Sequence, residues 1–195
     1  MSEETVLRKF RKDGWILTVT VDQDPVSPRE RPGNLGCMAL FHGRHDLPNE
    51  SGKTLAEFVE GFQTHSADVI HLHVYCMDHS GLTFRTDPRT FRAIDPQCWD
   101  WGQVGEIYVP LETARREFPE LSGKELSDRV TEELEREVEE LNSWYNGQCW
   151  LWHLEGPDGL QDSGTAYGGT LEEAFRLDTL HALCPEDILN HEITE

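Results

Sequence analysis

The chain has 195 residues, 37% of them hydrophobic and 28% charged, and its formal net charge is −20. This length fits one domain, and the aromatic content and regular patterning exclude a disordered acidic tail. No apolar run reaches the roughly 18 residues of a membrane-spanning helix, and residues 1–12 lack the apolar core of a signal peptide.

The acidic excess lies beyond residue 53, because residues 1–53 carry eight acidic and eight basic side chains. Residues 155–195 carry ten acidic side chains against one base, Arg176. A field of this sign repels nucleic acid and anionic membranes and attracts basic surfaces, including those of proteins that themselves hold nucleic acid.

Cysteine usage indicates a reduced protein. The count is odd, the spacings are wide and there is no C-x-x-C pair, which argues against a disulfide framework and a zinc knuckle. We therefore expect a cytoplasmic protein with free thiols at Cys37, Cys76, Cys98, Cys149 and Cys184.

The first elements in the chain are two strands around a loop. Residues 14–22 alternate, with Trp15 and Leu17 on one face and Ile16 on the other, which predicts a strand. Prolines and glycine in residues 24–34 indicate a loop, and residues 35–41 predict a second strand.

Three helix starts share the S/T-x-x-E capping pattern, in which hydroxyl and carboxylate each bind a backbone N–H at the helix start. The pairs are Thr54 with Glu57, Ser122 with Glu125, and Thr170 with Glu173. The predicted helices span residues 54–64, 124–145 and 171–183, with a shorter helix over 111–118.

Further strands are predicted between these helices, at residues 69–77, 82–86, 103–109, 148–154 and 161–167. The turn 78–81 joins the first two of them as a hairpin, and we expect residues 161–167 to pair with 148–154 across the turn at 156–159. Roughly seven strands with hairpin connections predict an α+β fold, with a largely antiparallel sheet and helices on one face. We expect a single domain over residues 1–195, with loose ordering at 1–13 and 185–195.

His71 and His73 are the first candidate for chemistry. Two residues apart on a strand, their side chains lie on one face, about 6.5–7 Å apart along it. With a third ligand they would suit zinc or iron; the sequence offers His42, His45, Asp78 and His79. Alternatively, the pair is polar surface on a solvent-facing sheet. Because spacing identifies no third ligand, we predict no metal and no cofactor.

The segment 98–105 places two tryptophans around Asp100, ahead of a strand that contains Gln103. Tryptophan is favoured at the centre of interfaces, so Trp99, Asp100 and Gln103 are candidates for partner binding. In the alternative interpretation, Asp100 caps backbone amides of a structural turn and at least one tryptophan is buried.

The helix predicted over 124–145 has an apolar stripe at steps of four and three, from Leu126 to Tyr145, and is otherwise strongly acidic. A row of carboxylates can imitate the phosphate spacing of duplex DNA, about one charge per 1.7 Å of axis, against a basic groove. The candidates for partner binding here are Glu132, Glu133, Glu135, Glu139 and Glu140. The alternative is a solvated amphipathic face.

Several short strings are familiar together: residues 33–36, 78–81, 99–109, 145–147, and 162–164 with 167–168. This set resembles a family of uncharacterised proteins carried by bacteriophages and mobile elements. The resemblance implies a genomic setting in which small acidic proteins act against host defences. It transfers no catalytic residues.

The sequence therefore favours a non-enzymatic, acidic binding protein that engages a basic, nucleic-acid-handling protein, such as a host defence nuclease. It would act in the cytoplasm, that of the host if phage-encoded, as a nucleic-acid mimic that binds neither nucleic acid nor membrane directly. The first alternative is a small metal-dependent enzyme that uses His71 and His73, and the second is a structural accessory protein with no ligand.

Overall fold

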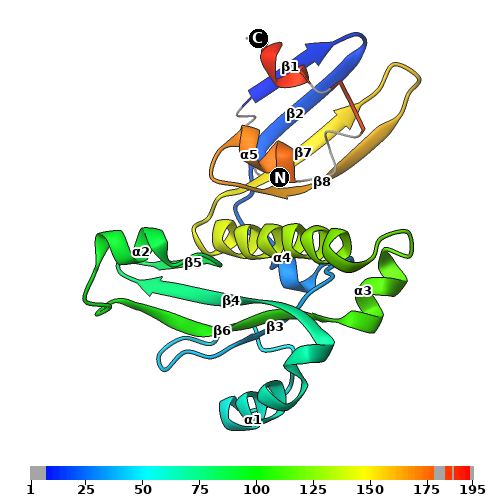
Figure 1. The fold of residues 1–195 in the computed structure, drawn as a ribbon. Coiled ribbons are helices and arrows are strands. Elements are labelled where there is room, and N and C mark those ends of the chain that lie inside the picture. Colours follow the sequence, from blue (N-terminus) through cyan, green and yellow to red (C-terminus); the bar gives the residue numbers. More distant parts are fainter. Residues whose placement is uncertain (1–7, 178–182, 186, 194–195) are drawn as a thin grey trace. The chain divides into compact units, whose positions relative to one another are not determined.

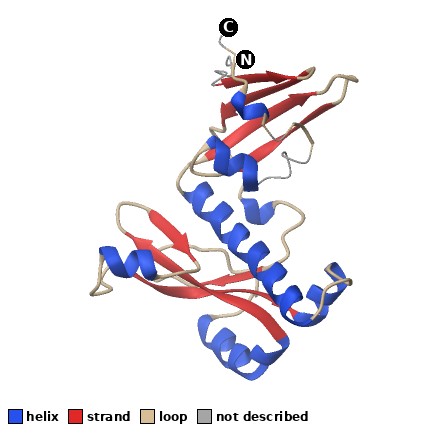
Figure 2. Ribbon diagram, turned by 45° about the horizontal axis from the view of Figure 1, so that its top comes forward, coloured by secondary structure: helices blue, strands red, loops and turns tan. Residues whose placement is uncertain are grey.

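The computed structural model describes residues 8–177, 183–185 and 187–193. Its contacts divide into two compact units, residues 28–142 and the paired segments 1–27 and 143–195. Each unit contains an antiparallel four-stranded sheet with helices (Figures 1 and 2). The α+β class is confirmed, while the strands expected in one sheet form two. The expectation of a single domain stays a prediction.

The sheet of residues 28–142 has the strand order β3-β6-β4-β5. Its members are β3 (Cys37–Leu40), β4 (Val69–Asp78), β5 (Leu82–Arg85) and β6 (Trp101–Pro110). β4 lies between β6 and β5, and all pairings are antiparallel. The alternation expected along β4 is present, because Val74 and Cys76 are buried on one face.

Helix α4 (Gly123–Tyr145) covers that buried face in Figure 1. Its apolar stripe follows the predicted spacing and is buried at Leu126, Val130, Leu134, Val138 and Leu141. Gly36 allows the close approach, since a Cβ there would lie 2.5 Å from Leu134 Cδ2 and 2.7 Å from Ile107 Cγ1. The buried stripe and the close contact at Gly36 thus both hold the long helix against the sheet.

Helix α1 (Leu55–His65) packs against the opposite face, where Phe58 and Phe62 contact the ring of Tyr108. Tyr108 follows the buried Ile107 on β6 and therefore points away from α4. The remaining helical elements of this unit are α2 (Arg89–Ile94), α3 (Leu111–Glu117), η1 (Pro28–Glu30) and η2 (Ser66–Asp68).

The other unit has the strand order β1-β2-β7-β8. Its elements are β1 (Arg8–Lys12), β2 (Trp15–Val21), β7 (Cys149–Glu155), β8 (Gln161–Tyr167), α5 (Leu171–Leu177) and η4 (Ile188–Asn190). The expected pairing of residues 148–154 with 161–167 is confirmed. Of the helix expected over 171–183, α5 covers residues 171–177, residues 178–182 lie outside the described residues, and residue 183 belongs to a turn.

The described parts of both termini contribute to one core, and the expectation of loose ordering at 1–13 and 185–195 stays a prediction. Phe10 and Ile188 are fully buried in one core, and backbone hydrogen bonds join Arg11 to His191 and Ile193 to Lys9. Single apolar residues in short, charged segments give little periodicity, so β1 could not be predicted from its pattern.

Two of the three predicted capping boxes form in full. Thr54 and Glu57 exchange backbone-to-side-chain hydrogen bonds, as do Thr170 and Glu173. At Ser122 the described contacts contain only a backbone bond to Leu126. All five cysteines are free thiols, as expected. Among the described residues, the helices are too short or too polar to cross a membrane.

Candidate functional site: a histidine–carboxylate cluster on the open sheet face

His71 and His73 lie on the face of the sheet that α4 does not cover. Both belong to β4, and their rings are 5.6 Å apart between centroids. In the pairing of β4 with β6, His73 lies opposite Glu106 and His71 opposite Tyr108. The sheet register therefore brings a carboxylate from β6 to the two imidazoles.

Glu106 joins the two rings. Its Oε2 lies 3.0 Å from His71 Nδ1, and its Oε1 lies 2.6 Å from His73 Nδ1. The side chain of Glu106 is only 8% exposed, so a carboxylate that is costly to bury is held among hydrogen-bond partners. Gln103 Nε2 donates a third hydrogen bond to Oε1, at 2.8 Å. Gln103, expected to bind a partner, belongs to this cluster.

The three side chains offer ligand atoms that all lie within 4.8 Å of one another. The sequence identified the two histidines but not Glu106, and none of the four candidates that it offered is the third member. Glu106 is more than 30 positions away along the chain, and β4 and β6 shift register between Val74 and Tyr75. Only the strand pairing, bulge included, makes this juxtaposition visible.

A groove of about 400 Å³ adjoins the cluster. Glu106, Gln103, Val104 and Gly105 form its strand side, and its other walls are apolar: Phe41, Leu55, Phe58, Val59 and Phe62. The edge of the Phe62 ring meets the His71 ring at 4.9 Å between centroids. The buried carboxylate thus lies at one end of an apolar groove, an arrangement common in small-molecule sites.

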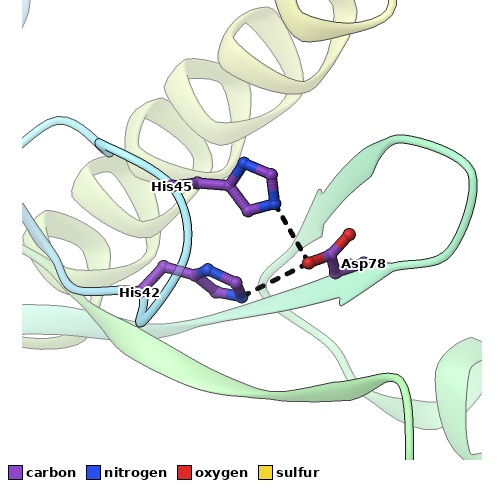
Figure 3. Close-up of side chains that lie close together, drawn as sticks. All are labelled: His42, His45 and Asp78. Atoms are coloured by element: carbon purple, nitrogen blue, oxygen red, sulfur yellow. Dashed lines mark hydrogen bonds and ion pairs between the residues drawn. The ribbon is translucent and has the colours of Figure 1, made fainter.

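A second polar cluster surrounds Asp78, at the end of β4. Figure 3 shows His42 and His45 directed at its carboxylate. Asp78 Oδ2 lies 3.0 Å from His45 Nε2, 3.8 Å from His42 Nε2 and 2.6 Å from a guanidinium nitrogen of Arg44. Burial raises the pKa of Asp78, but hydrogen bonding from His45 and the charge of Arg44 outweigh it and hold that pKa below 3.8.

These two clusters differ in what their histidines can do. The backbone N–H of Arg44 donates to His42 Nδ1 at 3.2 Å, so the proton of neutral His42 lies on Nε2, the atom directed at Asp78. The ligand atoms of His42, His45 and Asp78 also lie within 4.8 Å of one another, but His42 Nε2 could bind a metal only by losing this proton, and Arg44 already binds Oδ2 of Asp78. The hydrogen bonds described for His71 and His73 all involve Nδ1, so Nε2 of either ring can take a proton when Nδ1 binds a metal.

The loop before β6 corrects one prediction. Asp95, not Asp100, caps the backbone: its Oδ2 accepts from the N–H of Trp99 at 2.6 Å and of Asp100 at 3.0 Å. Asp100 instead contacts His79 Nδ1 at 3.1 Å. Trp99 is 82% exposed, whereas Trp101 is half-buried and donates to the carbonyl of Asp95.

The five acidic residues of α4 that were predicted to bind a partner fall into two groups. Glu140 is buried and paired with Arg136, and Glu133 is held between Arg129 and Arg136. The other three predicted residues are exposed, and they belong to a row at steps of three and four, here called the acidic row: Glu125, Asp128, Glu132, Glu135 and Glu139. Burial, followed by the charges of Glu139 and Glu132, raises the pKa of Glu135.

Comparisons of the chain with protein-family models, with curated proteins and with solved structures find no match. The resemblance to phage-borne proteins therefore stays an expectation, and the function must be argued from the site itself.

Proposed function

We propose that this protein is a small metal-dependent enzyme that binds one divalent transition metal, with zinc the first choice, through His71, His73 and Glu106. The observation that supports this most is the convergence of two imidazoles on one buried carboxylate. Two histidines and one carboxylate are a ligand set of catalytic zinc sites and of non-haem iron sites.

The geometry is close to what zinc requires. Bonds of about 2.0–2.1 Å in a tetrahedral arrangement place ligand atoms about 3.3 Å apart. The present separations, 3.0 Å and 2.6 Å between each Nδ1 and its carboxylate oxygen, are those of hydrogen bonds. A metal would replace the protons on Nδ1 and move the ligands apart by less than about 1 Å.

Three protein ligands leave a fourth coordination position. In catalytic sites a metal with such a position activates a bound water or polarises a substrate oxygen. The chain contributes Gln103, which holds the Glu106 carboxylate in place, and the groove, whose apolar walls border one side of the site. The structural alternative, that this is a polar surface network, makes the opposite prediction for metal binding.

The test is metal titration of the full chain by calorimetry, with cobalt(II) absorption as a report on coordination geometry. We expect one zinc per chain with a dissociation constant below about 1 μM. His71→Ala should weaken binding by at least about 100-fold and Glu106→Gln by at least about tenfold.

Two controls locate the site. His153→Ala removes a half-exposed strand histidine of the other sheet, and His45→Ala opens the Asp78 cluster; both should bind zinc as the unaltered chain does. Failure of the unaltered chain to bind zinc or cobalt, or loss of binding in His45→Ala, would contradict the proposal.

A second candidate function is the binding of a basic, nucleic-acid-handling protein by the acidic row, and the exposure of its five carboxylates favours it. Five exposed carboxylates over residues 125–139 span about 21 Å at 1.5 Å per residue, roughly one charge per 5 Å. This density is below the one charge per 3.4 Å of a single DNA strand, so the imitation of phosphate spacing is partial.

This second function is tested by reversing Glu132, Glu135 and Glu139 to lysine. The fold should survive because all three are exposed, and capture of a basic partner from host lysate should decrease. Capture should also weaken as salt is added, because the Debye length falls from about 10 Å at 0.1 M salt to about 3 Å at 1 M. If neither the substitutions nor the added salt reduces capture, the acidic row is not the surface that binds the partner.

Cytoplasmic location stays a prediction, supported by the five free thiols.

A further inference from the structure

The groove beside the histidine–carboxylate cluster continues the site as a ligand-binding surface. Phe41, Phe58 and Phe62 form a row of contacting rings, 5.7 Å and 5.2 Å between successive centroids, that ends at the His71 ring. An apolar group seated along this row would therefore have one end at the metal ligands.

Helix α1 supplies the outer wall of this groove. Leu55 and Val59, one turn apart, are 54% and 43% exposed although both are large apolar side chains. The capping box at Thr54 fixes the start of the helix, so these side chains are held in position without a ligand. Burying these two side chains against a ligand would contribute favourable hydrophobic free energy to binding.

The metal ligands at the polar end of the groove determine which ligand charge the site prefers. A divalent metal with neutral His71, neutral His73 and ionised Glu106 carries a net charge of about +1 in a partly buried place. An anionic oxygen donor neutralises this charge, whereas an ammonium group would be repelled and cannot coordinate. Gln103 Nε2, within reach of both His73 and Glu106, can donate to a second oxygen of the same head group.

We propose that the groove and the metal together bind a small carboxylic acid with an aromatic or branched apolar body. The carboxylate would take the fourth coordination position, and the body would lie between the phenylalanine row and Val59. The volume of about 400 Å³ is near the lower end of small-molecule sites, which favours a compact ligand. This inference rests on the proposed metal site.

The experiment uses the zinc-loaded full chain and 3-phenylpropionate as the probe, after zinc binding has been measured. We expect 3-phenylpropionate to bind at least about tenfold more tightly than acetate, which lacks the body, and than 3-phenylpropionamide, which lacks the charge. In the cobalt-substituted protein, the acid and not the amide should change the visible absorption, because only the acid coordinates.

Val59→Ser should weaken binding of the acid by at least about fivefold while the zinc affinity of the same variant stays unchanged. The matched control is Ile94→Ser, which alters an exposed apolar residue that does not line the groove. Equal affinity for acid and amide, or acid binding that Val59→Ser leaves intact, would overturn the inference while the metal site stands. If zinc itself does not bind, the proposed function fails first, and the two failures are thereby distinguished.

A protein partner that inserts an apolar side chain is the competing occupant. In that case 3-phenylpropionate would show no advantage over acetate, which also overturns the inference.

Discussion

Removing the Glu137 carboxylate should destabilise the protein more than removing any other acidic side chain of α4. Glu137 is completely buried and accepts from the Arg29 guanidinium at 2.5 Å. The same carboxylate accepts from the backbone N–H of Leu35 at 2.6 Å and of Gly36 at 3.1 Å. Arg29 is itself only 6% exposed, so Glu137→Ala leaves a buried cation and two buried donors short of a partner.

Breaking a buried ion pair by removing one partner costs about 3–5 kcal/mol, and each unsatisfied donor about 1–3 kcal/mol, with strong overlap between these terms. Arg29 keeps a bidentate bond to Glu50, which limits the loss. We therefore expect Glu137→Ala to lower the free energy of unfolding by about 3–5 kcal/mol. For a chain of this length, the corresponding fall in Tm is about 6–20 °C.

Urea denaturation and thermal melts of matched variants test this estimate. Glu139→Ala, an exposed neighbour on the same helix, should stay within about 0.5 kcal/mol of the unaltered protein. Glu137→Gln keeps an acceptor for the backbone donors but loses the charge, so it should lie between the two. Equal, small effects of Glu137→Ala and Glu139→Ala would show that the network around Arg29 does not stabilise the fold.

Three further outcomes follow from the contacts around the sheet. Asp95→Ala should lower Tm more than Asp100→Ala, because the carboxylate of Asp95 accepts from three backbone N–H groups of the loop; the reverse order in thermal melts would restore the capping role to Asp100. The lowered pKa of Asp78 stabilises the fold above pH 3.8, and this contribution is lost as the pH falls through the folded-state pKa. Asp78→Asn should therefore flatten the fall of Tm between about pH 4 and pH 2, and an unchanged profile would contradict this. Gly36→Ala, whose Cβ would lie 2.5 Å from a leucine methyl of α4, should cost about 1–3 kcal/mol, whereas Gly43→Ala meets nothing within 4 Å and serves as the control.

Local patterns in the sequence predicted the elements well where one periodicity dominates. The alternation along residues 69–77 identified β4 and the shared face of His71 and His73, and the step of three and four identified the buried stripe of α4. The capping boxes placed the starts of α1 and α5 because their hydrogen bonds join residues only three positions apart. These features depend on neighbours in the chain, so a single sequence contains them.

The division of the strands into two sheets and the third member of the site depend on long-range pairing. Glu106 faces His73 only because β6 pairs with β4 in one register, and a shift by one residue would send Glu106 to the opposite face. Three-dimensional contacts also explain why the exposure of Glu133 and Glu140 was not predicted. In the sequence both look like surface residues of an acidic helix. They are shielded because the side chains of Arg129 and Arg136, one turn away on the same helix, pair with them.

The acidic row and the histidine–carboxylate cluster can be tested independently because they belong to opposite sides of one sheet. α4 packs on the face that includes Ile107, and the cluster lies on the face that includes Tyr108. Layers pack about 10 Å apart, and the Debye length at physiological salt is about 8 Å, so the charge of the row is largely screened at the metal site. At about 0.01 M salt, where the Debye length reaches about 30 Å, the net charge of −20 should draw a cation to the protein and oppose a carboxylate ligand. Reversing Glu132, Glu135 and Glu139 to lysine should thus leave the affinities for zinc and for 3-phenylpropionate nearly unchanged at physiological salt, while it decreases capture of a basic partner. Loss of zinc affinity in this variant at physiological salt would instead mean that the row itself binds the metal.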